Sequence, residues 1–230
     1  ISFYFNKYES LSIKSWEALK RNYPTTPEEA FTYSGNKLFN QERLIEMKKK
    51  CENGELLSGW VIYEHPITGH QYVIGSDVAE GLGQDSSTGV VIDFTARIPK
   101  VVATYANNKI EPNIFAYELQ WAGNYFKSAF IAVERNNHGF ATISKLRELY
   151  AEDQIYQESP NKWGWHTNLV TKPKMMFDIA AAIQDDLLDI PSKAILSEMQ
   201  TYDKSDLNAI RFDIEATKHW DLLMATSIGF

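Results

Sequence analysis

Cysteine is almost absent from this chain of 230 residues, in which Cys51 is the only one. A single thiol excludes a disulfide within the chain and a cysteine-rich zinc site, and it is typical of a reducing compartment. The sequence also lacks an apolar run of membrane-spanning length and shows no signal-peptide pattern. It contains no phosphate-cradling Gly-x-x-x-x-Gly-Lys motif, which excludes nucleotide hydrolysis by that route.

Positive charge is in short supply, because 23 Lys and Arg stand against 30 Asp and Glu, a net charge of −7. This balance argues against a free-standing, tight, non-specific DNA binder. It does not exclude a nuclease, whose acids bind metal. With 44% apolar residues the chain can bury a core of one large domain, or of a domain with an appendage. It starts at Ile1 and stops at Phe230 inside a helical pattern, so we expect a piece of a longer protein.

The stretch from Gln71 to Asp93 predicts a β-hairpin whose first strand ends in an acid, Asp77. Strand alternation places Gly75 and Asp77 on the same face. An aspartate so close to a buried sheet is costly without a partner, and the surrounding sequence contains no Lys or Arg. Two partners are possible: a distant basic side chain, or a divalent cation held together with other acids.

Further patterns predict the rest of the architecture. The predicted strands are Leu57 to Glu64, pairing with Gln71 to Val78, then Lys100 to Tyr105, Phe130 to Glu134, and Ala209 to Glu215. The predicted helices lie within 1–22, after a capping box at Thr26, from Gln41 to Cys51 with Asn40 as cap, from Pro112 to about Lys127, from Phe140 to Tyr150, from Thr171 to about Asp186, from the cap Ser192 to near Tyr202, and after the cap Thr217. This order favours an α/β fold with a mixed sheet covered by helices.

Three acids form the candidate site. Asp77 and Glu134 each end a short apolar strand, and the crossover helix between these strands would make them parallel neighbours with both acids at one edge. Asp221 lies one turn inside the final predicted helix, on the side of the small Ala225. Three converging carboxylates are tolerable only with a dication or with separated pKa values. Oxygen ligands suit Mg²⁺ or Mn²⁺, and two such ions across a phosphodiester can activate water and stabilise the leaving oxygen.

Other polar residues near these acids have two interpretations each. Asp85 is either a turn residue or an auxiliary metal or water-positioning residue. His219 is either an orienting neighbour of Asp221 or a residue of a capped helix, and we favour the second. Candidate phosphate contacts, which could equally be turn formers or helix-start residues, lie after Glu134 and at the start of the helix that opens at Thr171: Arg135, Asn136, Asn137, Lys172 and Lys174.

Taken together, the motifs resemble the nuclease part of the large terminase subunit of tailed bacteriophages. The motifs that carry this resemblance span nearly the whole chain in order: Tyr-Pro-Thr-Thr-Pro-Glu-Glu-Ala-Phe from Tyr23, Gly-Ser-Asp77-Val-Ala-Glu-Gly-x-Gly-x-Asp85, Val-Glu134-Arg-Asn-Asn-x-Gly139, Gly-Trp-x-Thr before Thr-Lys-Pro, and His-x-Asp221-x-x-x-Ala225. The family often has a second acid beside the last aspartate, where this chain has Trp220.

The resemblance implies a ribonuclease H-like endonuclease that cuts concatemeric double-stranded viral DNA with Mg²⁺ or Mn²⁺, two ions held by Asp77, Glu134 and Asp221, with Asp85 as an auxiliary. It implies that residues 1–35 are a linker after a packaging ATPase and that 36–230 form the nuclease domain. The implied partners are DNA, the small terminase subunit and the portal, without a membrane. The expected location is the cytoplasm of an infected bacterium, and we expect the isolated domain to be monomeric.

Two alternatives remain. One is a catalytically silent assembly module that docks on the portal or the small subunit. The other is an actin-like or sugar-kinase ATPase, which would need two related lobes and a second glycine-rich phosphate hairpin that this sequence lacks.

Overall fold

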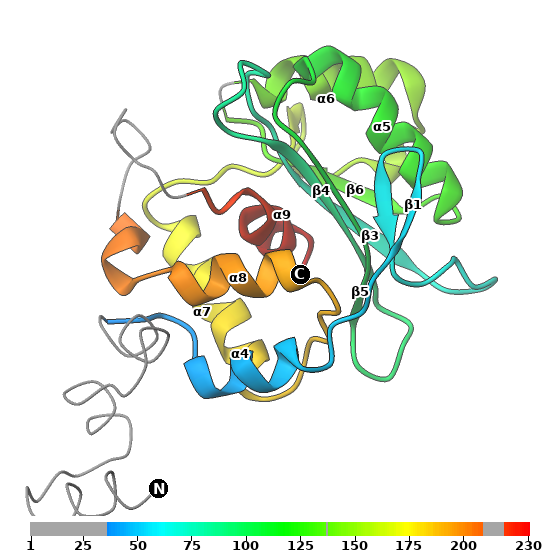
Figure 1. Ribbon diagram of the computed structural model, residues 1–230. Helices are drawn as coiled ribbons and strands as arrows, with labels where there is room; N and C mark the ends of the chain where they lie inside the picture. Colours follow the sequence, from blue (N-terminus) through cyan, green and yellow to red (C-terminus); the bar gives the residue numbers. More distant parts are fainter. Residues whose placement is uncertain (1–35, 137, 209–218) are drawn as a thin grey trace, which may run out of the picture.

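The computed structural model describes residues 36–136, 138–208 and 219–230. In this part of the chain a six-stranded mixed sheet carries helices on both faces (Figure 1). Its strands are β1 (Glu55–Leu57), β2 (Trp60–Ile62), β3 (Tyr72–Asp77), β4 (Ser87–Asp93), β5 (Lys100–Asn107) and β6 (Phe130–Val133). The helices are α4 (Gln41–Lys48), α5 (Pro112–Tyr125), α6 (Gly139–Leu149), α7 (Thr171–Gln184), α8 (Lys193–Thr201) and α9 (Asp221–Gly229), with short 3-10 helices η1 (Glu152–Gln154) and η2 (Lys204–Asn208).

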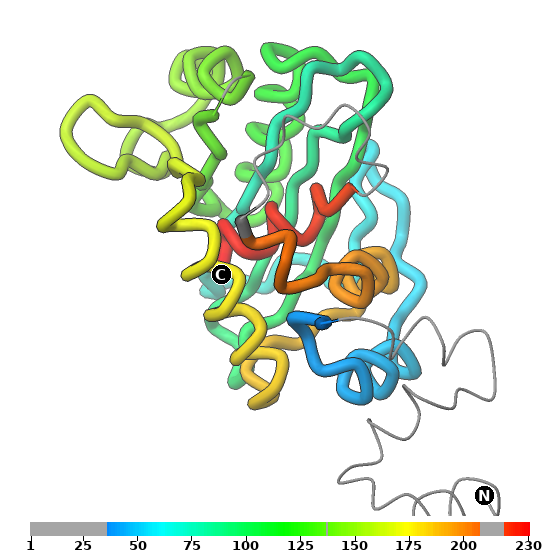
Figure 2. Tube along the Cα trace, turned by 90° about the vertical axis from the view of Figure 1, so that its left-hand side faces the viewer, coloured from blue at the N-terminus to red at the C-terminus, as the bar shows by residue number. Residues whose placement is uncertain are grey.

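A small hairpin of β7 (Gln157–Ser159) and β8 (Lys162–Trp163) projects from the body of the molecule (Figure 2). Each helix in the described part of the chain is too short or too polar to cross a membrane.

The strands of the large sheet lie in the order β1-β2-β5-β4-β3-β6. β3 and β4 form the predicted hairpin, in which Asp77 pairs with Thr88. β3 and β6 run parallel, with Ser76 paired to Val133, as a crossover through α5 requires. The hairpin and the parallel neighbours, both predicted from the sequence, are confirmed.

The predicted pairing of Leu57–Glu64 with Gln71–Val78 is wrong. Ser58 and Gly59 have φ angles of 48° and 82°, so the chain turns back there and β1 pairs with β2. β2 then pairs with β5. The physical reason is that a strand has two edges, and those of β3 are taken by β4 and β6.

Each face of the sheet has its own core. Figure 1 shows α5 and α6 on one face, and α9 with α4, α7 and α8 on the other. On the first face Ile74 of β3 packs in one cluster with Phe115 of α5 and Ile143 of α6. On the second face Ile92 of β4 belongs to a cluster with Leu223 of α9. Successive side chains of a strand point to opposite faces, which is how one hairpin supplies both cores.

α9 approaches β3 so closely that the two backbones touch. A Cβ atom at Gly75 would lie 2.1 Å from the carbonyl oxygen of Ala225 and 2.4 Å from the amide nitrogen of Gly229. Any side chain at this position would push the helix away. Because Asp77 shares a face with Gly75, the glycine brings α9 onto the side of the sheet from which Asp77 emerges.

The helix ends test several predictions. The side chains of Asn40 and Ser192 accept backbone hydrogen bonds at the starts of α4 and α8, which confirms both predicted caps. α4 ends at Lys48, before the predicted end. α9 begins at Asp221, after a non-helical Trp220 (φ −129°, ψ 40°), so the prediction that Asp221 lies one turn inside the helix is wrong.

Several predictions concern residues outside the described ones. They are the linker of residues 1–35 with its helical pattern and its capping box, Asn137, the strand from Ala209 to Glu215, and the cap at Thr217.

Candidate metal centre

Asp77 and Glu134 leave the sheet side by side. Ser76 pairs with Val133, and the next ladder bond runs from Glu134 N to Ser76 O at 2.9 Å. The two acids therefore follow in register on neighbouring strands, which are about 4.8 Å apart in the hydrogen-bonding direction. Residues in register on parallel strands point to the same face, here the α9 face. Asp77 is 1% exposed and Glu134 is 8% exposed, so both carboxyl groups are largely removed from water.

The loop after β6 holds the Glu134 side chain. Asn136 Nδ2 donates to Glu134 Oε1 at 3.2 Å and to the carbonyl oxygen of Thr167 at 2.7 Å. A Cβ at Gly139 would lie 1.7 Å from the Glu134 carbonyl oxygen, so α6 begins directly against this residue. The described contacts of Asn136 orient an acid, and the phosphate contact proposed for it from the sequence stays a prediction.

Asp221, the first residue of α9, is held to the β3–β4 hairpin by two hydrogen bonds. Its Oδ2 accepts a hydrogen bond from Ser86 N at 2.8 Å, and its carbonyl oxygen accepts one from Thr88 Oγ1 at 2.8 Å. Thr88 is the cross-strand partner of Asp77. Asp221, only 4% exposed, therefore sits over the end of the strand pair that carries Asp77.

Asp85 and His219 flank Asp221. His219 Nδ1 and Asp85 Oδ1 are 2.6 Å apart, and both side chains are half exposed. Among the described residues, Asp85, His219 and Asp221 form a group in which one ligand atom of each lies within 4.8 Å of the others. Asp77 and Glu134 lie outside this close group. The described partner of the His219 ring is Asp85 rather than Asp221, so a role for His219 in orienting Asp221 stays a prediction.

Sequence reasoning missed Glu198, on α8. Its Oε2 accepts a hydrogen bond from Leu223 N at 2.8 Å. Burial, and then the nearby charges of Asp221 and Asp77, raise the pKa of the Glu198 carboxyl from 4.5 to about 8. In the sequence Glu198 is one acid among the polar positions of an amphipathic helix, most of which face solvent. No local signal separates it from them.

The predicted DNA contacts have different surroundings. Arg135 forms an ion pair with Glu158 of β7 at 2.8 Å, and Lys172 Nζ donates to the carbonyl oxygen of Asp206 at 3.0 Å. Lys174 is exposed on α7. A role in DNA binding stays a prediction for all of them, and for Asn136 and Asn137.

The sequence matches no family model and no curated protein. Solved structures, however, share the fold of this chain. The large terminase nuclease of thermophilic phage G20c has a TM-score of 0.64 at 18% identity, over 84% of this chain and 97% of that chain. The same nuclease with bound magnesium has a TM-score of 0.63 at 16% identity, over 84% and 96%.

Two further nuclease domains are similar. The large terminase nuclease domain of Thermus phage P74-26 has a TM-score of 0.59 at 17% identity, over 84% of this chain and 94% of that chain. The human cytomegalovirus terminase nuclease domain, soaked with manganese and bound to an inhibitor, has a TM-score of 0.52 at 8% identity, over 84% and 93%.

The described part of the chain has the fold of these terminase nuclease domains. The predicted fold class, a ribonuclease H-like mixed sheet flanked by helices, is confirmed. One fold can carry many different chemistries, so the residues of the site, and not the fold, determine the function.

Proposed function

We propose that this chain is a metal-dependent endonuclease that cleaves concatemeric double-stranded viral DNA during genome packaging. The main support is the position in the fold of three largely buried acids. Asp77 ends β3, Glu134 follows the parallel β6, and Asp221 opens the helix that covers both strands. These elements adjoin at one edge of a sheet whose fold is shared with viral nuclease domains.

The donor set fits a divalent cation. Two carboxylates 4 Å apart repel by about 4 kcal/mol at an effective dielectric constant of 20, and low exposure makes this repulsion harder to screen. Either a retained proton or a cation relieves it. Carboxylate oxygens suit Mg²⁺ and Mn²⁺, and among the similar domains one is described with magnesium and one after a manganese soak.

In this proposal Asp77, Glu134 and Asp221 hold two ions, and Asp85 is an auxiliary ligand that His219 orients. When bound, such ions lower the pKa of an attacking water and stabilise the charge on the leaving oxygen of a phosphodiester.

The chain's own task is to keep the carboxylates fixed and shielded from water. Asn136 holds Glu134, and Ser86 N holds the carboxylate of Asp221.

DNA contacts and partners complete the proposal. Lys174, exposed near the start of α7, offers its charge directly to a phosphate, whereas Arg135 and Lys172 would exchange their present partners for it. A net charge of −7 favours weak DNA binding by this chain alone. We therefore infer that an attached ATPase, the small subunit and the portal hold the substrate, in the cytoplasm of an infected bacterium.

Nicking of supercoiled plasmid in Mn²⁺ tests the proposal. Asp77→Asn, Glu134→Gln and Asp221→Asn should each abolish nicking, and EDTA should abolish it for the wild-type chain. The matched control is Asp93→Asn, because Asp93 is 2% exposed like the site acids but contacts His70 at the opposite end of β4. It should lose stability and keep nicking.

Unimpaired nicking by any of the three site variants would exclude that acid from the metal centre. A wild-type chain that cuts no DNA in Mn²⁺ or Mg²⁺ would overturn the proposal and favour the silent assembly module.

A further inference from the structure

α9 has no cap of its own. Asp221 is its first residue, and the preceding Trp220 makes no side-chain capping hydrogen bond. The first four N–H groups of a helix have no partner within the helix, so they need one from elsewhere. Leu223 N finds it in Glu198 Oε2, at 2.8 Å, on α8.

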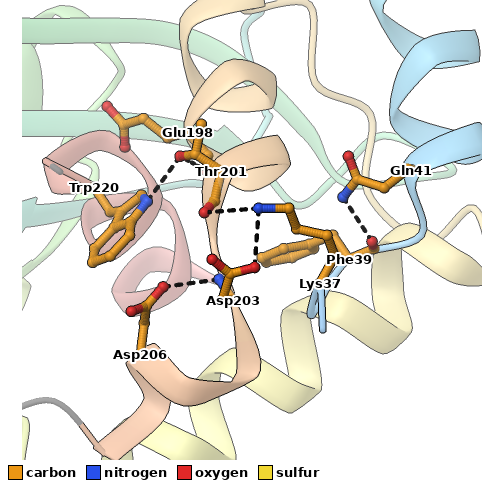
Figure 3. Close-up of polar contacts among 8 residues, drawn as sticks. All are labelled: Lys37, Phe39, Gln41, Glu198, Thr201, Asp203, Asp206 and Trp220. Carbon is orange, nitrogen blue, oxygen red and sulfur yellow. Dashed lines mark hydrogen bonds and ion pairs between the residues drawn. The ribbon is translucent and has the colours of Figure 1, made fainter. Parts of the chain in front are cut away.

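A second contact ties α8 to the residue before Asp221. Trp220 Nε1 donates to Thr201 Oγ1 at 3.0 Å, and the Trp220 ring meets the Tyr202 ring edge-on with centroids 4.8 Å apart. Figure 3 shows Glu198 and Thr201 on the same helix, with the indole of Trp220 reaching Thr201. α8 therefore holds the chain on both sides of Asp221.

The position of this cap is electrostatically costly. Burial, followed by the charges of Asp221 and Asp77, raises the pKa of Glu198 to about 8. A serine or asparagine would cap the helix without placing another acid beside these two.

We propose that Glu198 is a positioning residue of the metal centre. It fixes the first turn of α9 and thereby the position and orientation of the Asp221 carboxylate. This inference rests on the proposed function. It adds Glu198, which is not one of the three proposed ligands, to the residues on which the metal centre depends. Glu198 acts through the Leu223 amide, and Asp221 remains the group that holds the ion. Loss of the cap would let the first turn of α9 unwind and Asp221 lose its orientation, although its hydrogen bond from Ser86 would remain available.

Two variants separate positioning from direct coordination. Glu198→Gln keeps an oxygen that can accept from Leu223 N but cannot ionise, whereas Glu198→Ala removes the acceptor altogether. The control is Gln200→Ala, on the same helix, because Gln200 Oε1 accepts a hydrogen bond from Lys48 of α4 and because two residues along a helix place Gln200 about 200° around the axis from Glu198. The 230-residue chain should be compared in each form by Mn²⁺ titration, by hydrogen exchange of the Leu223 amide without metal, and by steady-state DNA cleavage.

We expect Glu198→Ala to weaken Mn²⁺ binding by about tenfold or more, the usual effect of removing a group that orients a ligand. Its Leu223 amide should exchange faster, and kcat should fall with little change in KM. Glu198→Gln should restore protection of the amide and most of the Mn²⁺ affinity. Gln200→Ala should match the wild type in all three measurements.

Each other outcome overturns the inference. Wild-type Mn²⁺ affinity in Glu198→Ala would show that the cap does not set Asp221, while the proposed function stands. Equal loss in Glu198→Gln and Glu198→Ala, with the Leu223 amide protected in Glu198→Gln, would make Glu198 itself a ligand. A wild-type chain that binds no Mn²⁺ would remove this inference and the proposed function together.

Discussion

Gly75 of β3 and Ala225 of α9 are in backbone contact, with no room for a side chain between them. Asp77 lies two residues after Gly75 along the strand, and Asp221 lies one helical turn before Ala225. The contact therefore sets the separation of two proposed metal ligands that are 144 positions apart in the sequence. The absence of a side chain at Gly75 therefore determines how closely Asp221 can approach Asp77.

Gly75→Ala should separate α9 from the sheet. The added methyl group would meet Ala225 O at 2.1 Å, and because both partners are backbone, relief requires movement of the helix. We expect a loss of about 1–3 kcal/mol in the free energy of unfolding, typical of overpacking, together with loss of DNA nicking. Urea denaturation and plasmid nicking would measure the two effects.

The control for this prediction is Gly123→Ala. Its Cβ would lie 2.8 Å from the Tyr150 ring, so it should also destabilise the fold, but on the side of the sheet that α5 and α6 cover. Its nicking per folded molecule should be unchanged. Full nicking activity in Gly75→Ala would refute the idea that this contact sets the site.

Asn136→Ala should release the Glu134 carboxylate, because the Asn136 amide bridges Glu134 Oε1 and the carbonyl oxygen of Thr167. We expect nicking and Mn²⁺ affinity to fall by about tenfold or more, with a small change in melting temperature. Asn136→Asp should be worse, since it adds a negative charge beside an acid. Asn124→Ala, at an exposed position of α5, is the control. If Asn136 contacts only phosphate, DNA affinity should fall and Mn²⁺ affinity should not.

The stability of the fold at high pH should depend on Tyr150. Its hydroxyl donates to the carbonyl oxygen of Ala129 at 2.9 Å, and burial, with a smaller contribution from the charge of Asp153, raises its pKa from 10 to about 12. A folded-state pKa above the unfolded one means that the native state holds the proton more tightly. The stabilisation is therefore complete below pH 10 and is lost as the pH rises toward 12.

Tyr150→Phe should cost about 1 kcal/mol of unfolding free energy near neutral pH, the net value of one hydrogen bond. It should also flatten the decline in stability above pH 10. Urea denaturation across the pH range would measure both, with Tyr117→Phe as a control because Tyr117 is 44% exposed. An equally steep decline in wild type and Tyr150→Phe would assign the effect to other groups.

The sequence by itself determined most of the elements and the placement of Asp77 and Glu134 at the ends of neighbouring parallel strands. The apolar runs before Asp77 and Glu134, and the helix start at Pro112 between them, are local signals. Together with the handedness and order of a crossover connection, they were enough to predict parallel strands that end in acids at one edge. The caps at Asn40 and Ser192 were predictable for the same reason, since a cap bonds to the backbone a few residues away.

Only the tertiary structure decided which segments meet across long sequence separations. The pattern of Leu57–Glu64 was that of a strand, but β2 paired with β5, because pairing depends on which sheet edges are free. Likewise α9 starts at Asp221 because α8 holds Trp220 and caps Leu223 from outside. The contacts of Glu198 with Leu223 and of His219 with Asp85 also join residues that are far apart in the sequence. The periodicity of a helix shows which of its faces is buried. It does not show which residues of other elements that face will contact.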